Sequence, residues 1–282
     1  MVSTLVVQHP TLSEHAVQAF SRLAGHRPDL KGHSLALWRR VAISGEQLDD
    51  AAQTHQVDAE IVASDLQLRS VRLAAFDMDS TLITIECVDE IADFAGRKAE
   101  VAAITEAAMR GDITDYDESL RRRVALLAGL PVSVLQRVWD ERVRLSPGAE
   151  SLVRRMKSTG LQLLLVSGGF SFFTERLAAR LGIEHVQSNQ LDIADGRLTG
   201  RLNGPIVNAQ AKRLALERTA SRIGFPLSQT IAIGDGANDL KMMSVAGLSV
   251  AYRAKPLVRN ETTHAINHCG LDSLLRLFED TR

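Results

Sequence analysis

The sequence predicts an α/β protein: a Rossmann-like doubly wound parallel sheet with a helical insertion and a small N-terminal α/β unit. Two observations predict this fold. From about residue 70 onward, short apolar runs that indicate buried strands alternate with helical stretches. Apolar strands separated by helices are typical of parallel sheets covered on both faces. In addition, three of the runs end directly in acidic or glycine-rich residues, as strands do at a ligand-binding crevice.

The predicted core elements follow one another in a regular order. Strands are expected at residues 72–76, 161–166, 230–233 and 248–252. Helices are expected at residues 148–158, 171–181 and 208–223, and a glycine follows each of them, as a left-handed helix C-cap requires. Residues 190–207 break the alternation. There, Asp195-Gly196 lies between two segments of alternating polarity, which predicts a β-hairpin inserted on the sheet.

Two segments fall outside this pattern. Residues 84–146 are rich in Ala, Glu and Arg and contain no clear strand, which predicts a helical insertion over the carboxyl end of the first core strand. Residues 1–69 show a strand near 3–7, a helix near 13–24 and mixed signals beyond. We therefore expect three parts: an N-terminal α/β module (1–69), a core (70–83 and 147–282) and a helical insertion (84–146).

The composition excludes several classes of function. With 33 basic and 34 acidic residues, the 282-residue chain has a formal net charge of −1 and no basic excess to hold a nucleic-acid backbone. Its apolar runs are far shorter than the roughly 18–20 residues of a membrane span, and the N-terminus lacks the features of a secretory signal. Cys87 and Cys269 show neither metal-binding nor redox spacing. We expect a cytoplasmic protein that binds neither nucleic acid nor membranes.

Three predicted strand ends carry polar residues that can bind a metal and react. They are Asp77-Met78-Asp79, Ser167-Gly168-Gly169 and Gly234-Asp235-Gly236. Because the carboxyl ends of parallel strands meet at one edge, these groups are expected to lie together. Asp77 and Asp79 would share one face of an extended segment, where their repulsion calls for a cation or a proton. With Asp235 across the crevice they predict a hard-cation site, and Mg²⁺ is the expected ion.

The remaining groups at this edge suit a phosphate. Ser167 and the backbone N–H groups of Gly168 and Gly169 can donate hydrogen bonds to phosphate oxygens, aided by the N-terminus of the following helix. Lys212, near the start of the helix expected at 208–223, can place a positive charge on the same phosphate. Each motif alone also occurs in turns, calcium-binding loops or solvated helices. Their convergence favours phosphoryl transfer, with one carboxylate as nucleophile and another as proton carrier.

These residues resemble the haloacid dehalogenase (HAD)-type phosphatase superfamily. The D-x-D-x-T signature occupies residues 77–81, the second motif is Ser167, the third is Lys212, and the fourth is GDGAND at 234–239. All four occur in order within roughly residues 73–274. The helical insertion is similar to the substrate-reading cap of the phosphoserine phosphatase branch, in TIECVDEI (84–91) and YDESLRRRV (116–124). The resemblance implies a HAD core with a helical cap.

The resemblance also implies a role for each motif residue. Asp77 would attack phosphorus as the nucleophile and form an aspartyl-phosphate. Asp79 would protonate the leaving oxygen and then activate water. Mg²⁺ would be held by Asp77, Asp235 and the backbone carbonyl of Asp79. The expected phosphate-binding and supporting residues are Ser167, Gly168, Lys212 and Asn238. Asp239 would orient either Lys212 or a metal-bound water.

The insertion is expected to recognise the rest of the substrate. By resemblance, Glu86 faces the substrate ammonium group and Arg123 binds its carboxylate, for which the planar guanidinium is suited. Arg121 and Arg122 are alternatives for the second role, and Tyr116 would line the pocket where the family often has another aromatic residue. The implied reaction is Mg²⁺-dependent hydrolysis of O-phospho-L-serine, the last step of L-serine biosynthesis. The alternative is another small-molecule HAD phosphatase or a phosphotransferase, for example one acting on phosphohomoserine.

The N-terminal part leaves several roles open. Residues 1–69 are compatible with an ACT-type small-molecule-binding module, which accompanies some members of the family, with formation of a homodimer, and with a purely structural role. A regulatory binding protein without catalysis is disfavoured, because such a protein needs no nucleophile. His264 and His268 are four positions apart without an evident acidic partner, so both are expected at the surface.

Overall fold

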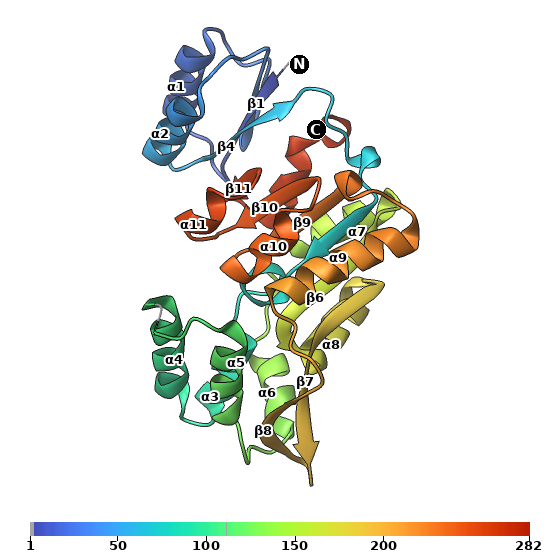
Figure 1. Ribbon diagram of the computed structural model, residues 1–282. Coiled ribbons are helices and arrows are strands. Elements are labelled where there is room, and N and C mark those ends of the chain that lie inside the picture. Colours follow the sequence, from blue (N-terminus) through green and yellow to red (C-terminus); the bar gives the residue numbers. More distant parts are fainter. Residues whose placement is uncertain (1–2, 111) are drawn as a thin grey trace.

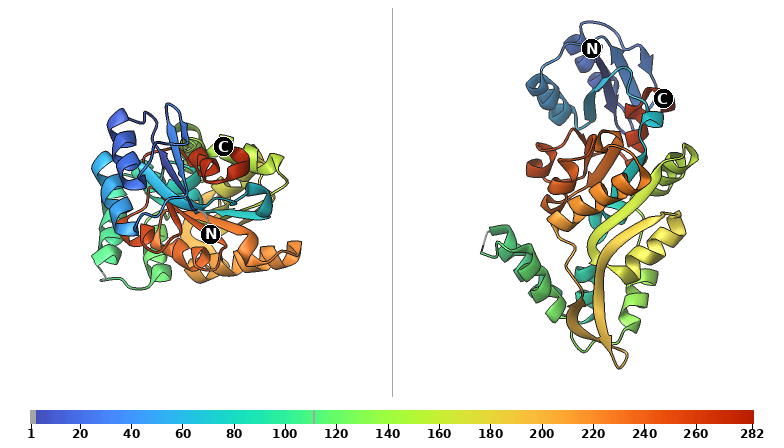
Figure 2. Two further views of the ribbon diagram at one scale, coloured as in Figure 1. Left: turned by 90° about the horizontal axis from the view of Figure 1, so that it is seen from above. Right: turned by 45° about the vertical axis from the view of Figure 1, so that its right-hand side comes forward.

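The computed structural model of the protein describes residues 3–110 and 112–282. A seven-stranded sheet forms the middle of an elongated molecule. An N-terminal unit (residues 3–63) packs at one end of this core, and a helical cap (residues 84–146) lies at the opposite end (Figures 1 and 2). The core therefore lies between the N-terminal unit and the cap, the two parts that the sequence predicts outside it.

The N-terminal unit is a four-stranded antiparallel sheet whose order is β2-β3-β1-β4. Its elements are β1 (Ser3–Gln8), α1 (Glu14–Ala24), β2 (Leu30–Lys31), β3 (Leu35–Arg39), α2 (Gly45–His55) and β4 (Asp58–Ala63). This order of strands and helices is ferredoxin-like. In β1, Leu5 and Val7 pack with the helices, whereas Val6 joins the hydrophobic cluster of the core. Buried apolar surface therefore attaches the unit to the core.

The core sheet has the order β11-β10-β9-β5-β6-β7-β8, and all neighbouring strands are parallel except β7 and β8. Its strands are β5 (Leu73–Phe76), β6 (Gln162–Phe170), β7 (His185–Ala194), β8 (Arg197–Asn203), β9 (Thr230–Gly234), β10 (Leu248–Tyr252) and β11 (His264–Ile266). Its helices are α7 (Ala149–Ser158), α8 (Ser171–Leu181), α9 (Ala209–Ile223), α10 (Leu240–Met243) and α11 (Pro256–Arg259). The short turns are η1 (Leu68–Ser70), η2 (Met78–Leu82), η3 (Leu227–Gln229), η4 (Ala237–Asp239), η5 (Leu271–Leu277) and η6 (Glu279–Thr281).

Apolar side chains pack on both faces of this sheet. In β5, Leu73 and Ala75 belong to the cluster that contains α9 and α10, while Ala74 and Phe76 belong to the cluster that contains α7 and α8. All four side chains are buried, so β5 is an uninterrupted apolar run, as a strand covered on both faces must be. The predicted doubly wound α/β core is confirmed.

The hairpin differs from the prediction in its first arm. It turns at Asp195 and Gly196, whose φ angles of 49° and 71° are the left-handed pair of a two-residue turn. The first arm, however, is the second half of β7, and the first half of that strand pairs in parallel with β6. The three-residue strand β11 was not predicted, because three residues carry no periodic signal.

The cap consists of the helices α3 (Cys87–Phe94), α4 (Lys98–Arg110), α5 (Tyr116–Ala125) and α6 (Ser133–Glu141). Apolar residues of the cap, among them Ile91, Leu120 and Leu135, share the main hydrophobic cluster with the core. The loop after α5 also bonds to the hairpin, since Gly129 donates its N–H to the Leu198 carbonyl at 2.8 Å. These contacts dock the cap against the sheet on its carboxyl-end side (Figure 1).

Two carboxylates of β4 bind the edge strand of the core sheet. Asp58 is 2% exposed and accepts hydrogen bonds from the three successive backbone N–H groups of residues 267–269. Glu60 accepts another from Ala265 at 2.7 Å. Because β11 is an edge strand, its N–H groups would otherwise be open to pairing with other chains. The N-terminal unit thus covers one edge of the core sheet.

The expectation that His264 lies at the surface is wrong. Its side chain is 8% exposed, and its Nδ1 lies 3.0 Å from Glu60 Oε2. The acidic partner comes from β4, 204 positions away, so no local pattern in the sequence reveals it. His268 is half-buried, and its ring centroid lies 6.0 Å from that of His9.

The described helices are short. The longest, α9, has 15 residues, against the roughly 20 that a bilayer span requires. None of the helices in the described part of the chain is long and apolar enough to cross a membrane.

Candidate active site

The site lies where the carboxyl ends of β5, β6 and β9 meet beneath the cap. The chain leaves β5 for β6 on one side and later returns to β9 on the other, which makes this the switch point of the sheet, where ligands of such folds bind. A cavity of about 180 Å³ opens there. Its lining residues are Asp77, Asp79, Glu86, Val88, Tyr116, Leu120, Arg123, Ser167, Gly168, Gly169, Phe170, Asp235 and Asn238. Two site residues expected from the sequence, Lys212 and Asp239, lie behind this lining, where Lys212 contacts both Asp77 and Asp239.

The chain after β5 forms an irregular turn that aims two aspartates at the cavity. Asp77 begins it by accepting the Met78 N–H at 2.7 Å. Asp79 and Ser80 depart from helical dihedral angles, and Ser80 has a φ of 53°. A left-handed serine costs roughly 1–3 kcal/mol, so the surroundings must hold it. Its hydroxyl donates a 2.6 Å hydrogen bond to Glu86 Oε1, which ties the turn to the start of the cap.

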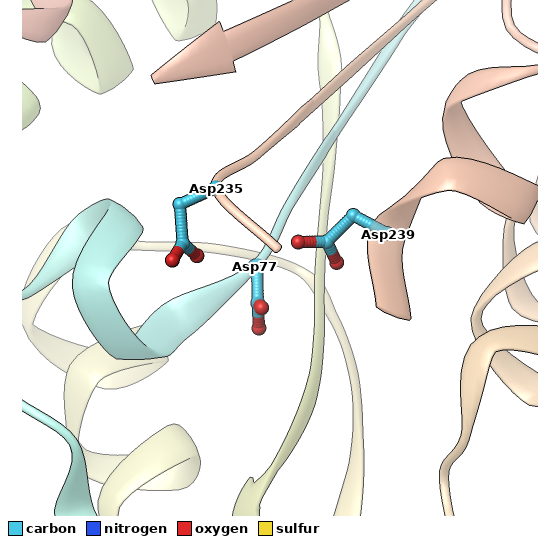
Figure 3. A group of neighbouring side chains, drawn as sticks. All are labelled: Asp77, Asp235 and Asp239. Atoms are coloured by element: carbon cyan, nitrogen blue, oxygen red, sulfur yellow. The ribbon is translucent and has the colours of Figure 1, made fainter. Parts of the chain in front are cut away.

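Three aspartates form an acidic cluster (Figure 3). Oxygens of Asp77, Asp235 and Asp239 lie within 4.8 Å of one another, and Asp77 lies between the other two. Burial, followed by the charges of Asp77 and Asp239, raises the pKa of Asp235 to about 8, although a 3.1 Å hydrogen bond from Thr81 acts against this. Carboxylates that repel one another in this way are what a hard divalent cation stabilises. The donor set therefore fits a divalent metal.

Lys212 supplies a fixed positive charge to this cluster. Its side chain is 0% exposed, and Nζ lies 2.7 Å from both Asp77 Oδ2 and Asp239 Oδ1. Burial opposes the charge, but the two carboxylates raise the pKa of Lys212 well above its usual value, so the group stays protonated. The other oxygen of Asp239 accepts the Gly236 N–H at 3.1 Å. Asp239 is thus engaged in holding Lys212 and its own loop, which leaves Asp77 and Asp235 as the better metal ligands.

Asp79 has a different environment from Asp77. Its Oδ1 is buried and has no hydrogen-bond partner in the part of the chain that the structure describes. Burial, together with the nearby charges of Glu86 and Asp77, raises the pKa of Asp79 well above its usual value. A carboxyl group that keeps its proton can act as a general acid, whereas a carboxylate paired with a lysine cannot. The two aspartates are therefore suited to different roles in one reaction.

The end of β6 forms the other wall of the cavity. Ser167 is fully buried, and its Oγ accepts the Gly169 N–H at 2.9 Å. That N–H, which the sequence suggested as a phosphate donor, is thus engaged with the serine. The Gly168 carbonyl accepts a 2.7 Å hydrogen bond from Asn189 Nδ2. Sequence reasoning missed Asn189, since an asparagine within an exposed strand carries no motif, yet it fixes the conformation of this loop.

Glu86 and Arg123 reach the cavity from the cap. The Nε of Arg123 is buried and has no hydrogen-bond partner. Glu86 stands at the open side of the cavity. Desolvation, followed by the charge of Asp77, raises the pKa of the Glu86 carboxyl, against the lowering effect of the hydrogen bond from Ser80. Glu86 and Arg123 therefore add an acceptor and a donor to the cavity that the aspartates line.

Arg121 and Arg122, the alternatives to Arg123, do not line the cavity. Their side chains are 57% and 54% exposed, and they pair with acidic residues of the same helix. The geometry therefore favours Arg123 for binding a group inside the cavity.

Comparison with known proteins identifies the family. A family model of haloacid dehalogenase-like hydrolases matches residues 74–244. The phosphoserine phosphatase of Polaromonas sp. is 58% identical over 221 residues, which are 77% of this chain and 94% of that protein. The chain belongs to the phosphoserine phosphatase family of haloacid dehalogenase-like hydrolases. The predicted family and the predicted enzyme class, a phosphoric monoester hydrolase, are confirmed.

Solved structures extend the likeness to the N-terminal unit. A HAD family hydrolase from Salmonella enterica serovar Typhi matches with a TM-score of 0.90 and 33% identity, over 100% of this chain and 99% of that chain. A probable phosphoserine phosphatase from Vibrio cholerae matches with a TM-score of 0.83 and 33% identity, over 99% of this chain and 87% of that chain. The family thus includes proteins with the same three-part arrangement.

Proposed function

We propose that this enzyme hydrolyses O-phospho-L-serine to L-serine and phosphate with the help of Mg²⁺, as the last step of L-serine biosynthesis in the cytoplasm. One observation carries the proposal: a single cavity is lined by Asp77 and Asp79 on one side and by Glu86 and Arg123 on another. The aspartates suit phosphoryl transfer. A carboxylate and a guanidinium suit the ammonium and carboxylate groups of an amino acid. Together they describe a phosphorylated amino acid.

In this proposal, the two aspartates divide the chemistry. Asp77 attacks phosphorus, the bond from phosphorus to the serine oxygen breaks, and an aspartyl-phosphate forms. Asp79 gives its proton to the departing serine oxygen. It then accepts a proton from the water that attacks the aspartyl-phosphate, which releases phosphate and restores both side chains. The raised pKa of Asp79 supports its part, because the group must begin the cycle protonated.

The surrounding groups stabilise charge on the phosphoryl group. Asp77, Asp235 and the backbone carbonyl of Asp79 would hold Mg²⁺, which when bound neutralises the phosphoryl oxygens as a Lewis acid. The proposed phosphate-binding residues are Ser167, Gly168 and Lys212, with Asn238 ordering the pocket. Hydrolysis of phosphate monoesters needs accelerations of up to about 10²¹, and general acid catalysis supplies only about 10²–10⁴. Electrostatics and positioning must supply the rest.

The proposal assigns a task to each part of the chain. Residues 70–83 and 147–282 are the catalytic core, residues 84–146 the substrate-reading cap and residues 1–69 an accessory module. The family model covers the cap and the core as far as residue 244, but not the accessory module. The ferredoxin-like order of that module supports an ACT-like role, and we further propose that the protein forms a homodimer. Size-exclusion chromatography with light scattering measures the molar mass in solution and so tests whether the protein is a dimer.

The test of the proposed function is phosphate release from a panel of monoesters, each with Mg²⁺ and with EDTA. The panel contains phosphoserine, phosphothreonine, phosphohomoserine, phosphoglycolate and a sugar phosphate. We expect a strong, metal-dependent preference for phosphoserine. Metal-dependent preference for another member would retain the mechanism and refute the substrate. Transfer to added alcohols instead of water would favour the phosphotransferase alternative.

A further inference from the structure

We propose that the hydroxyl of Tyr116 donates a hydrogen bond to the transferring phosphoryl group, so that the cap completes the phosphate site. This inference rests on the proposed function and deepens it. Tyr116 is the first residue of α5, the cap helix that also carries Arg123, and its side chain lines the cavity. A residue that binds the phosphoryl group from the cap would act only when the cap is docked.

The hydroxyl of Tyr116 lies against Gly168, in the phosphate-binding segment at the end of β6. A Cβ atom built on Gly168 would lie 2.1 Å from Tyr116 Oη, so any other residue at this position would displace the hydroxyl. The backbone of Gly168 does not have the positive φ that demands glycine. The glycine is therefore required by the close approach of the tyrosine.

The hydroxyl of Tyr116 is available to donate a hydrogen bond to a ligand. Burial raises the pKa of Tyr116 to about 12, so the group is neutral and carries its proton at physiological pH. Among the described residues, it has no hydrogen-bond partner. The charged groups close enough to influence it include Lys212, Arg123 and Asp77. A phosphoryl group attacked by Asp77 and held by Lys212 and Gly168 must lie among these neighbours.

A second contact holds this part of the cap in place. Asp117, the next residue, accepts a 3.0 Å hydrogen bond on Oδ1 from Asn208 Nδ2. Asn208 is also the N-cap of α9, where its Oδ1 accepts the N–H groups of Gln210 and Ala211. This helix carries Lys212 in its first turns. Two adjacent residues of the cap therefore touch two phosphate-binding elements, the end of β6 and the start of α9.

Asn189 links those two elements through two hydrogen bonds. It is 2% exposed, its Nδ2 donates to the Gly168 carbonyl at 2.7 Å, and its Oδ1 accepts the Val207 N–H at 2.8 Å. A closed set of contacts thus links four parts of the molecule: the first turn of α5, the end of β6 at Gly168, Asn189, and the segment before α9. These contacts hold the hydroxyl of Tyr116 against Gly168.

The test is Tyr116→Phe, which removes the oxygen and keeps the ring. We would measure kcat and KM for phosphoserine, for phosphoethanolamine, which lacks the carboxylate, and for phosphoglycolate, which lacks the ammonium group. We expect kcat/KM to fall by the same factor for all three, about tenfold to a hundredfold, as for a lost hydrogen bond to a charged group. Binding of inorganic phosphate should weaken as well.

Three results would overturn the assignment. They are unchanged phosphate binding, unchanged kcat/KM, or a loss confined to the two substrates that carry a carboxylate. Wild-type enzyme without phosphoserine activity would instead refute the proposed function, and phosphate binding by Tyr116→Phe would still test the hydroxyl.

A matched pair of variants tests the contact that holds the tyrosine. Asn208→Asp keeps a good N-cap for α9 but sets a second carboxylate against Asp117. We expect it to lower kcat/KM for all three substrates. Combining it with Asp117→Asn restores a hydrogen bond in the opposite direction, and activity should recover. Failure of the double variant to recover, with circular dichroism unchanged, would contradict the contact between cap and α9.

Discussion

Asp77 and Asp79 show how residues two positions apart acquire different chemistry. Asp77 pairs with Lys212 and accepts the backbone N–H of Met78. Asp79 has a buried oxygen with no partner and a raised pKa. One side chain is prepared to attack and the other to give a proton. This difference arises from the surroundings, since the two residues are chemically identical.

Replacement of the nucleophile should abolish turnover without unfolding the protein. In Asp77→Asn the amide keeps the shape of the carboxylate but cannot form an acyl-phosphate, so we expect phosphate release to fall by about 10³-fold or more. Phosphate release gives the rate and circular dichroism gives the fold. A well-folded variant that retains a tenth of the activity would contradict the role of Asp77.

The acidic cluster predicts a link between pH and the effect of Mg²⁺. Without metal, the pKa of Asp235 is about 8 in the folded protein, against about 3.9 in an unfolded chain. Between these values the folded state binds more protons than the unfolded state, so stability must fall as pH rises. Mg²⁺ competes with the proton and should raise Tm more at pH 8 than at pH 5.

Thermal unfolding with Mg²⁺ and with EDTA at both pH values measures this effect. Asp235→Asn serves as the control, because it removes the titrating group. We expect this variant to show a flatter pH dependence and a smaller gain from Mg²⁺. An equal gain at both pH values in the wild-type protein would contradict the link.

At the scale of elements, β4 and β11 are two edge strands joined by side chains. Glu60 accepts the N–H of Ala265 in β11, and Asp58 accepts the three N–H groups of residues 267–269, directly after that strand. An ordinary β-ladder would have merged the two sheets. This arrangement keeps them separate and still leaves the edge of the core sheet covered.

Removal of the Asp58 carboxylate should destabilise the protein but spare catalysis. Asp58→Ala leaves three N–H groups, one buried and two partly buried, without this acceptor, which should lower the free energy of unfolding by about 2–4 kcal/mol. Urea denaturation measures the loss. Asp49→Ala, at an exposed position of α2, is the control and should change stability by less than about 0.5 kcal/mol. Equal stability of the two variants would show that the contact contributes little.

Local patterns in the sequence determine how much of the fold could be predicted. The strand expected at 248–252 and the helix expected at 171–181 have those bounds in the structure. The strand expected to end at residue 166 continues to Phe170, because the Ser-Gly-Gly segment that suggested a turn remains extended and Phe170 pairs with Asn189. Periodicity finds an apolar strand, but it cannot tell where pairing stops.

The site shows the same limit. Asp77, Asp79, Ser167 and Asp235 could be predicted because each follows a recognisable strand. The roles of Asn189 and His264, and the approach of Tyr116 to Gly168, could not. These contacts join residues far apart in the chain, and Asn189 and His264 belong to no motif, so only the tertiary structure reveals them.

At the scale of the whole molecule, one hydrophobic cluster runs through all three parts. It contains Val6 of the N-terminal unit, Leu165 of the core and Leu135 of the cap. Continuous burial of this kind favours cooperative unfolding. The elongated shape in Figure 2 therefore does not imply three independent folding units.

The two tryptophans allow unfolding to be followed separately at opposite ends of the molecule. Trp38 is buried in the N-terminal unit, and Trp139 lies in α6 of the cap. In the single-tryptophan variants Trp139→Phe and Trp38→Phe, fluorescence follows one end at a time. We expect the midpoint of urea unfolding from each reporter to coincide with the midpoint from circular dichroism of the same variant. Midpoints that differ would show that one end opens first.

The burial of Lys212 has a practical consequence for labelling. The chain has few lysines, and Lys31, Lys98, Lys241 and Lys255 are exposed, whereas Lys212 is enclosed between two carboxylates. Amine-reactive dyes and cross-linkers act on exposed, unprotonated amines. Such reagents should therefore modify the outside of the folded enzyme and leave its reactive centre untouched. The protein can be coupled to a fluorophore or a solid support through lysine and remain a working catalyst.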